Sequence, residues 1–119
     1  LGAKLKAIHD AMVKTKLPPE EVAKRIKKGA LLVDVRSKLE ARKGIAPGAT
    51  NISLFTLKRH LDELPRDRNI VLYCGTGGRA GKAKEVLEAA GFKAFNGGGY
   101  AAILKILGKQ TAPRATDHG

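Results

Sequence analysis

The chain has 119 residues, of which 43% are hydrophobic and 4% aromatic, and its formal net charge at pH 7 is +12. This composition suits one domain with a mainly aliphatic core and excludes a disordered chain. The one cysteine excludes an internal disulfide and any multi-cysteine metal site, and the absence of a block of five like charges argues against a nucleic-acid-binding arm.

The N-terminal part of the chain is predicted to be helical. Apolar residues recur at helical spacing within residues 1–16, which predicts an amphipathic extension. Lys16 and Leu17 are then expected to form a short edge strand. A helix is predicted from Pro18 to about Lys28, because prolines begin it, acids occupy its first turn and a glycine follows its end.

The middle of the chain alternates between strands and helices. The apolar run at residues 30–35 is typical of a strand that is buried on both faces. A turn of helix is expected within residues 37–44, and a short strand at residues 50–52. Ser53 is placed to cap a helix over residues 54–64.

The last third of the chain repeats this alternation. We expect a strand at residues 69–73, a helix over about residues 80–90 and a strand at residues 92–95. Three glycines at positions 97–99 then predict a flexible turn, and a final helix is expected over residues 100–107.

Together these elements predict an α/β fold, a three-layer domain with a mainly parallel central sheet flanked by helices. The domain would span residues 17–108, followed by a loose polar tail at residues 109–119. No apolar run predicts a membrane span, and no signal-peptide pattern is visible. The sequence begins with Leu1 rather than Met, which is compatible with removal of an upstream segment. We therefore expect a soluble protein of the cytoplasm or periplasm.

The strongest functional signal is a glycine-rich loop that starts at Cys74. A strand precedes this loop and a helix follows it, which is a geometry that points backbone N–H groups at an anion. These groups are expected to converge on the sulfur and favour a thiolate nucleophile. The predicted site consists of the catalytic Cys74 and the loop residues Gly75, Thr76, Gly77, Gly78, Arg79 and Ala80.

Side chains in and around this loop can be interpreted as functional or as merely structural. Cys74 would be a buried structural thiol in the alternative reading, but a polar glycine-rich loop is poor core material. Arg79 offers a fixed positive charge and a two-pronged donor for a sulfonate or phosphate. Lys82 and Lys84 either attract anions at the entrance or form a solvated helix face.

Four segments in this order resemble the single-domain rhodanese (thiosulfate sulfurtransferase) family. The shared features are a strand ending in Asp-Val-Arg, a glycine-proline turn before the next strand, the cysteine loop and a closing glycine segment. They lie at residues 32–37, 44–52, 71–79 and 90–98. The resemblance covers residues 17–107 and implies the rhodanese fold.

The resemblance also implies a mechanism. The Cys74 thiolate would take sulfane sulfur from a small anionic donor such as thiosulfate, and the resulting persulfide would pass it to cyanide or a thiol. Loop amides would stabilise the charged sulfur, and Arg79 would orient the donor or brace the loop. No metal or other cofactor is implied. Asp34 and Arg36 would help to organise the site, although a scaffold ion pair is the alternative.

Two other functions compete with this enzyme. One is a persulfide carrier or binding module without turnover for a partner protein, as sulfur acceptor, or for RNA. The net positive charge would attract RNA, although nucleic acid is not the expected partner. The other is a small phosphatase or arsenate reductase. The span from Cys74 to Arg79 has only six residues, which favours sulfur over a bulkier tetrahedral oxyanion.

Overall fold

The structure is a computed structural model, and it describes residues 16–117. The predicted N-terminal helical extension lies outside the described residues, except for Lys16. Four strands form one parallel sheet in the order β2-β1-β3-β4. The strands are β1 (Leu31–Asp34), β2 (Thr50–Asn51), β3 (Ile70–Cys74) and β4 (Ala94–Gly99). The helices are α2 (Pro19–Lys27), α3 (Lys38–Arg42), the 3-10 helix η1 (Leu54–Glu63), α4 (Gly78–Ala89) and α5 (Tyr100–Asp117).

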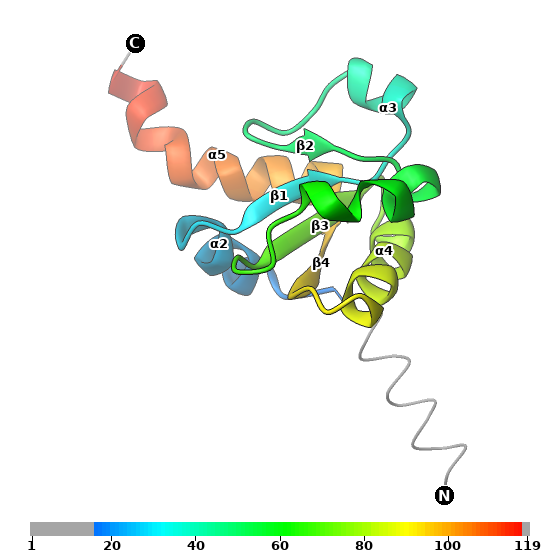
Figure 1. Ribbon diagram of the computed structural model, residues 1–119. Helices are drawn as coiled ribbons and strands as arrows, with labels where there is room; N and C mark the ends of the chain where they lie inside the picture. Colours follow the sequence, from blue (N-terminus) through cyan, green and yellow to red (C-terminus); the bar gives the residue numbers. More distant parts are fainter. Residues whose placement is uncertain (1–15, 118–119) are drawn as a thin grey trace, which may run out of the picture.

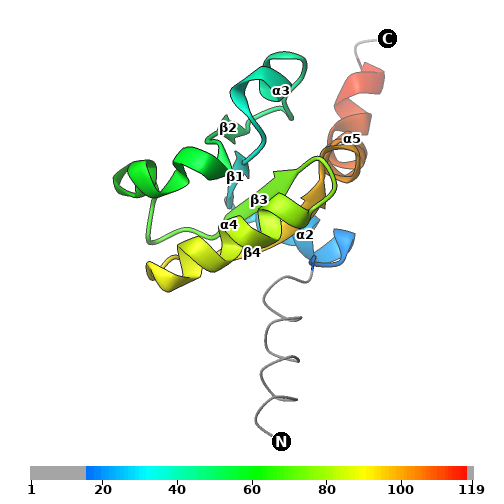
Figure 2. The ribbon, with the colours of Figure 1, turned by 90° about the vertical axis from the view of Figure 1, so that its right-hand side faces the viewer.

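Helices cover both faces of the sheet. In Figure 1, η1 and α4 lie in front of the strands and α2 and α5 lie behind them, and Figure 2 shows the three layers from the side. Alternate residues of β3 point into the two cores: Leu72 packs with the cluster that contains Leu57 and Leu87, and Val71 packs with Val22. Every residue of β3 is at most 1% exposed. The predicted three-layer α/β fold is therefore confirmed.

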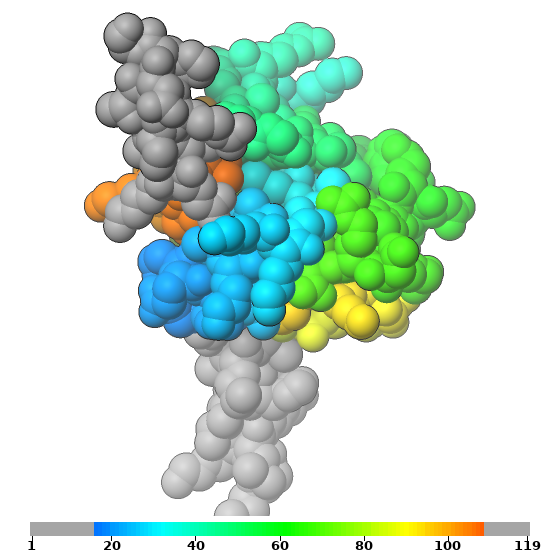
Figure 3. All heavy atoms as spheres, turned by 90° about the vertical axis from the view of Figure 1, so that its left-hand side faces the viewer, coloured from blue at the N-terminus to red at the C-terminus, as the bar shows by residue number. Residues whose placement is uncertain are grey.

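All four strands run in the same direction, so their carboxyl ends lie at one edge of the sheet. The starts of α3, η1, α4 and α5 follow these ends, and Figure 2 looks toward this edge. Figure 3 shows the opposite edge, where α2 and the chain segments that enter the strands lie. In open sheets of this kind, ligands bind beyond the carboxyl ends. The fold thus places the end of β3 where a site is expected.

The prediction of a flexible turn at residues 97–99 is wrong, because these glycines form the last half of β4. They are needed for close packing. A Cβ at Gly97 would lie 2.7 Å from Cγ1 of Val71, and a Cβ at Gly99 would lie 2.5 Å from the carbonyl oxygen of Gly75. Glycine in a strand interior marks such a close backbone approach.

Three other elements differ in detail from their prediction. The final helix continues to Asp117, so the stretch predicted as a loose tail is helical up to that residue. The glycine at position 108 does not end the helix, since a glycine in a helix costs only about 1 kcal/mol. Residues 16–17 form no strand, but the Leu17 amide donates to the Asn96 carbonyl at 2.8 Å. The helix after Ser53 is 3-10 rather than α. None of the described helices combines the length and the apolar character that crossing a membrane requires.

Candidate active site

Cys74 is the last residue of β3, and four residues later the chain is already in α4. Its Sγ accepts a hydrogen bond from the Gly77 amide at 2.9 Å, and the residue is 1% exposed. This bond depends on a tight curl of the loop, in which Gly77 has φ +107°. That conformation disfavours any residue with a Cβ. The loop therefore curls around the thiol.

The loop amides are arranged differently from their prediction. We expected the N–H groups from Gly75 to Ala80 to converge on the sulfur, but within residues 16–117 only Gly77 donates to it. The N–H groups of Gly78, Arg79 and Ala80 form the first turn of α4, and no described residue accepts from them. The first amides of a helix have no partner within it and carry its partial positive charge. These three donors are therefore available to an anion.

Strand β4 holds the loop from one side. The side-chain amide of Asn96 donates to the Gly77 carbonyl at 3.0 Å, and its oxygen accepts from the Gly98 amide at 2.9 Å. Asn96 is 1% exposed. The backbone of Gly99 lies against the Gly75 carbonyl at a distance that leaves no room for a side chain. One side chain and one glycine contact thus fix the two halves of the cysteine loop.

Glu40 of α3 holds Arg79 from the other side. Its two carboxylate oxygens accept from Nη1 and Nη2 of Arg79 at 2.7 and 3.0 Å. The bond with Arg79, followed by that with the Ser37 amide, lowers the pKa of Glu40 from 4.5 to about 2. The same pairing raises the pKa of Arg79. Arg79 is therefore engaged by a carboxylate that neutralises much of its charge.

The sequence reasoning did not identify Glu40. A local signal was present, because Ser37 and Glu40 form a capping box: the Ser37 hydroxyl accepts from the Glu40 amide, and the Glu40 carboxylate accepts from the Ser37 amide. This motif fixes where the carboxylate lies relative to α3. Its partner Arg79 is 39 positions away in the sequence, so only the fold brings the two together.

Asp34 and Arg36 form a buried ion pair, and the charge of Arg36 also acts on Arg79 of the loop. Arg36 donates to the Asp34 carboxylate through its amide, Nε and Nη2, the last at 2.8 Å, and Nη2 also donates to the Gly44 carbonyl. The hydroxyl of Tyr73 donates to Asp34 at 3.0 Å and accepts from the Ala46 amide. Hydrogen bonding to Asp34 raises the pKa of Arg36, and burial raises the pKa of Tyr73 to about 12.

This network braces the turn before β2. Tyr73 packs with the core cluster behind the sheet, whereas Cys74 packs with the cluster in front of it. The Asp34 and Arg36 side chains thus bond to groups on the opposite face from the sulfur. Their geometry is that of a scaffold pair, the alternative reading from the sequence.

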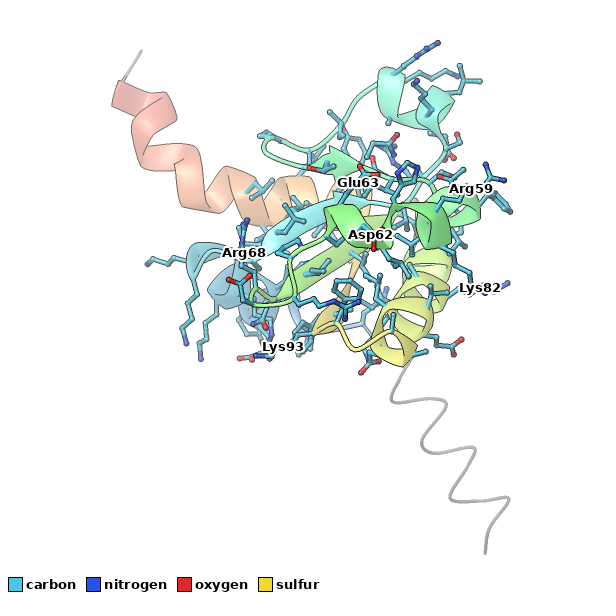
Figure 4. The ribbon with its side chains drawn as sticks, in the orientation of Figure 1. Arg59, Asp62, Glu63, Arg68, Lys82 and Lys93 are labelled. Atoms are coloured by element: carbon cyan, nitrogen blue, oxygen red, sulfur yellow. The ribbon has the colours of Figure 1, made fainter. Side chains whose placement is uncertain are left out.

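The remaining predicted residues lie at the same edge as the loop. Gly75, Thr76 and Gly78 are exposed. Lys84 pairs with Glu88 at 2.5 Å, whereas Lys82 has no ion pair with a described residue and points outward from α4 (Figure 4). No group of three potential metal ligands occurs in the part of the chain that the structure describes.

An open cavity of about 410 Å³ lies elsewhere, at the side where β1 and β2 begin. Leu31, Thr50, Leu64 and Arg68 are among its lining residues, and none of the loop residues is. The chemistry of the loop therefore does not take place in this cavity.

Comparisons with known proteins agree with the geometry. The Rhodanese-like domain family matches residues 18–105. A sulfurtransferase of Allochromatium vinosum is 34% identical over 52% of this chain and 58% of its own length, and a tRNA sulfurtransferase of Desulfurococcus amylolyticus is 38% identical over 56% of this chain and 13% of its own. The chain thus spans little more than half of the first relative and a small part of the second.

A solved structure of a rhodanese homologue from Thermus thermophilus is 34% identical, with a TM-score of 0.60 over 74% of this chain and 99% of that one. Fold, loop position and family match coincide on the same residues. The chain belongs to the rhodanese-like domain family.

Proposed function

We propose that the protein is a sulfurtransferase that carries sulfane sulfur on Cys74, from thiosulfate or a similar donor to a thiophilic acceptor. The observation that carries this proposal is the position of the sulfur. It accepts a hydrogen bond from the Gly77 amide and lies next to the N-terminus of α4. Such a thiol has a donor for its charged form and free amides beside it for an anionic substrate. The relatives named as sulfurtransferases support the same chemistry.

The first step is a displacement at sulfur. The Cys74 thiolate attacks the outer sulfur of thiosulfate, a new S–S bond forms, the donor's S–S bond breaks, and the electron pair leaves with sulfite. The enzyme is left as a persulfide, and no external oxidant is needed. The Gly77 amide and the free amides of Gly78 to Ala80 would stabilise the negative charge on sulfur and on the departing sulfite.

The second step restores the enzyme. An acceptor nucleophile, cyanide or a thiolate, attacks the outer sulfur of the persulfide, and the S–S bond breaks to release the Cys74 thiolate. The product is thiocyanate or a new persulfide. The two half-reactions share one site, so ping-pong kinetics are expected.

Access and orientation follow from the loop. The sulfur is buried, but Gly75 and Thr76 beside it are exposed, and glycine permits the small shift that admits a narrow donor. An arginine has five N–H donors, of which Glu40 takes two from Arg79. We therefore assign two roles to Arg79. Its main role is to brace the loop, and its remaining N–H groups contact the anionic donor.

Intact-mass spectrometry tests the proposal directly. After incubation with thiosulfate, the protein should gain the mass of one sulfur atom, and cyanide should remove it. Cys74→Ser removes the only thiol in the chain and should show no gain. A protein that gains no sulfur would contradict the proposal, whereas one that loads but does not discharge to cyanide would be a persulfide carrier instead.

A further inference from the structure

Cations outnumber acids in the segments that follow the carboxyl ends of β1 and β2. Residues 36–59, which follow the carboxyl ends of β1 and β2, contain six cations and one acid, Glu40. Residues 62–68, on the path to the opposite edge, contain three acids and two cations. In Figure 4, Arg59 and Lys82 lie near the carboxyl ends of the strands, and Arg68 lies at the other side. The segments that surround the edge with Cys74 thus combine several cations with a single acid.

Of these cations Arg36 is buried and pairs with Asp34, but the others are not neutralised within the domain. Glu40 is the one acid in this region, and Arg79 already occupies it. The other cations there are exposed, and none forms an ion pair with a described residue. They are Lys38, Arg42, Lys43, Lys58, Arg59 and Lys82.

The two most exposed large apolar side chains among the described residues lie among these cations. Phe55 is 85% exposed and Leu39 is 64% exposed. Burial of either side chain would be favourable, but the domain leaves both exposed. Aromatic side chains are enriched at protein interfaces relative to the rest of the surface.

Both apolar residues lie close to the cysteine loop. Leu39 precedes Glu40, whose carboxylate bonds to Arg79 of the loop. Phe55 follows Leu54, whose amide donates to the Val35 carbonyl, and the Val35 amide in turn donates to the Tyr73 carbonyl. Two strand spacings thus separate this part of η1 from the end of β3, roughly 10 Å. A partner that covers Leu39 and Phe55 would reach Cys74 as well.

We infer that this edge is the docking face for an acidic protein that exchanges sulfur with Cys74. The docking face consists of Leu39, Phe55 and the six exposed cations named above. The inference rests on the proposed function and names the class of partner that the site serves: a protein with an acidic surface, an apolar residue to cover Phe55 and a thiol or persulfide. Charge complementarity would steer the encounter, and the apolar contacts would hold it.

The apolar residues favour a protein over RNA. A nucleic-acid site combines cations with aromatic rings on which bases stack. The docking face has one exposed ring, and its other large apolar side chain, Leu39, is aliphatic and offers no stacking plane. Aliphatic and aromatic residues together suit the apolar centre of a protein interface with a charged rim.

Binding of synthetic peptides tests the inference without any need for a loaded thiol. The probe is a short fluorescent peptide of glutamates with one leucine and one serine, compared with an otherwise identical peptide that has glutamines. At low salt, the full chain should bind the glutamate peptide about tenfold more tightly, and high salt should abolish the difference. Equal binding of the two peptides would overturn the inference.

Charge reversals locate the binding. Lys58→Glu with Arg59→Glu should abolish the preference for glutamate, and Phe55→Ser should weaken binding of the leucine-containing peptide. The matched control is Lys27→Glu with Lys28→Glu, an equal charge change on two exposed lysines at the end of α2, at the opposite edge. Equal losses in both double variants would overturn the inference, since they would show only attraction to net charge.

Sulfur transfer connects binding with the site. Cys74 is loaded, its persulfide is confirmed by mass, and the peptides are made with cysteine in place of serine. The glutamate peptide should then accept sulfur about tenfold faster than the glutamine peptide, whereas a small neutral thiol should react equally with wild type and Lys58→Glu/Arg59→Glu. A failure to load Cys74 would contradict the proposed function but not the docking face, because the peptide-binding comparison does not require a loaded thiol. Tighter binding of a single-stranded RNA of equal charge would assign the face to RNA and overturn the inference.

Discussion

The carboxylate of Glu40 accepts hydrogen bonds from both terminal nitrogens of Arg79, which joins α3 to the start of α4 across the mouth of the cysteine loop. The pair is partly exposed, with side-chain exposures of 41% and 36%. Its first effect is therefore to position the loop, because partly exposed ion pairs contribute little free energy of unfolding. Its second effect is electrostatic, because it removes a free carboxylate from an otherwise cationic edge.

The low pKa of Glu40 predicts a pH-dependent contribution to stability. Pairing with Arg79 lowers this pKa to about 2 in the folded protein, from 4.5. A carboxyl group whose pKa is lowered by folding stabilises the protein above its unfolded pKa, and this contribution is lost as the pH falls through the folded value. Glu40→Gln should therefore lower the free energy of unfolding by at most about 1 kcal/mol at neutral pH. The difference from wild type should shrink between pH 4.5 and 2.

Urea denaturation across this pH range provides the measurement. Glu20→Gln is the control, because its carboxylate is exposed and has no ion pair with a described residue. A wild-type advantage over Glu40→Gln that persists unchanged at pH 2 would show that the Arg79 pairing is not its source.

The structure shows which parts of this arrangement the sequence can reveal. Strand β3 and helix α4 are predictable because their signals are local: an apolar run for the strand, and a helix bounded by glycines. Cys74 could be located for the same reason, since it lies at the end of the strand. Local periodicity therefore determines where the thiol lies in the fold.

The contacts that hold the loop were not predictable from local patterns. Gly97 to Gly99 have the composition of a turn, but they continue β4. They are glycines because β3 lies too close to Gly97, and the loop too close to Gly99, for a side chain. The pairing of Glu40 with Arg79 joins residues 39 positions apart. Such long-range requirements of space and charge appear only once the sheet order is known.

Asn96 gives a test of how the loop is held. Its side-chain amide bonds to the Gly77 carbonyl, and Gly77 in turn donates to the Cys74 sulfur. Asn96→Ala should cost about 1–3 kcal/mol of unfolding free energy, because buried backbone groups lose a partner, and should slow sulfur loading of the folded protein. Chemical denaturation and the rate of mass gain with thiosulfate measure the two effects.

The matched control is Asn69→Ala, which removes the same atoms from a side chain without a hydrogen bond to a described residue. It should load sulfur at the wild-type rate. If Asn96→Ala lost stability but loaded just as fast, Asn96 would hold the fold and not the loop.

Gly99 tests the contact between β4 and the loop. A methyl group there would lie 2.5 Å from the Gly75 carbonyl, so Gly99→Ala must displace the loop backbone. We expect a large loss of sulfur loading at temperatures where the protein stays folded. Gly108→Ala is the control, because its Cβ would meet nothing within 4 Å, and alanine is favoured in a helix by about 0.5–1 kcal/mol. Wild-type loading by folded Gly99→Ala would refute the close fit.

Substitution of Asp34 tests whether its ion pair with Arg36 stabilises the fold or acts on the thiol. Asp34→Asn leaves Arg36, whose side chain is 8% exposed, without its carboxylate partner, and should cost about 3–5 kcal/mol of unfolding free energy. Glu21→Gln is the surface counterpart, since Glu21 pairs with Arg25 at 39% exposure, and it should change the free energy of unfolding far less. Below its unfolding midpoint, folded Asp34→Asn should load sulfur at close to the wild-type rate, because Asp34 bonds on the face of the sheet opposite Cys74. A strong loss of loading in molecules shown by circular dichroism to be folded would instead place Asp34 among the residues that act on the thiol.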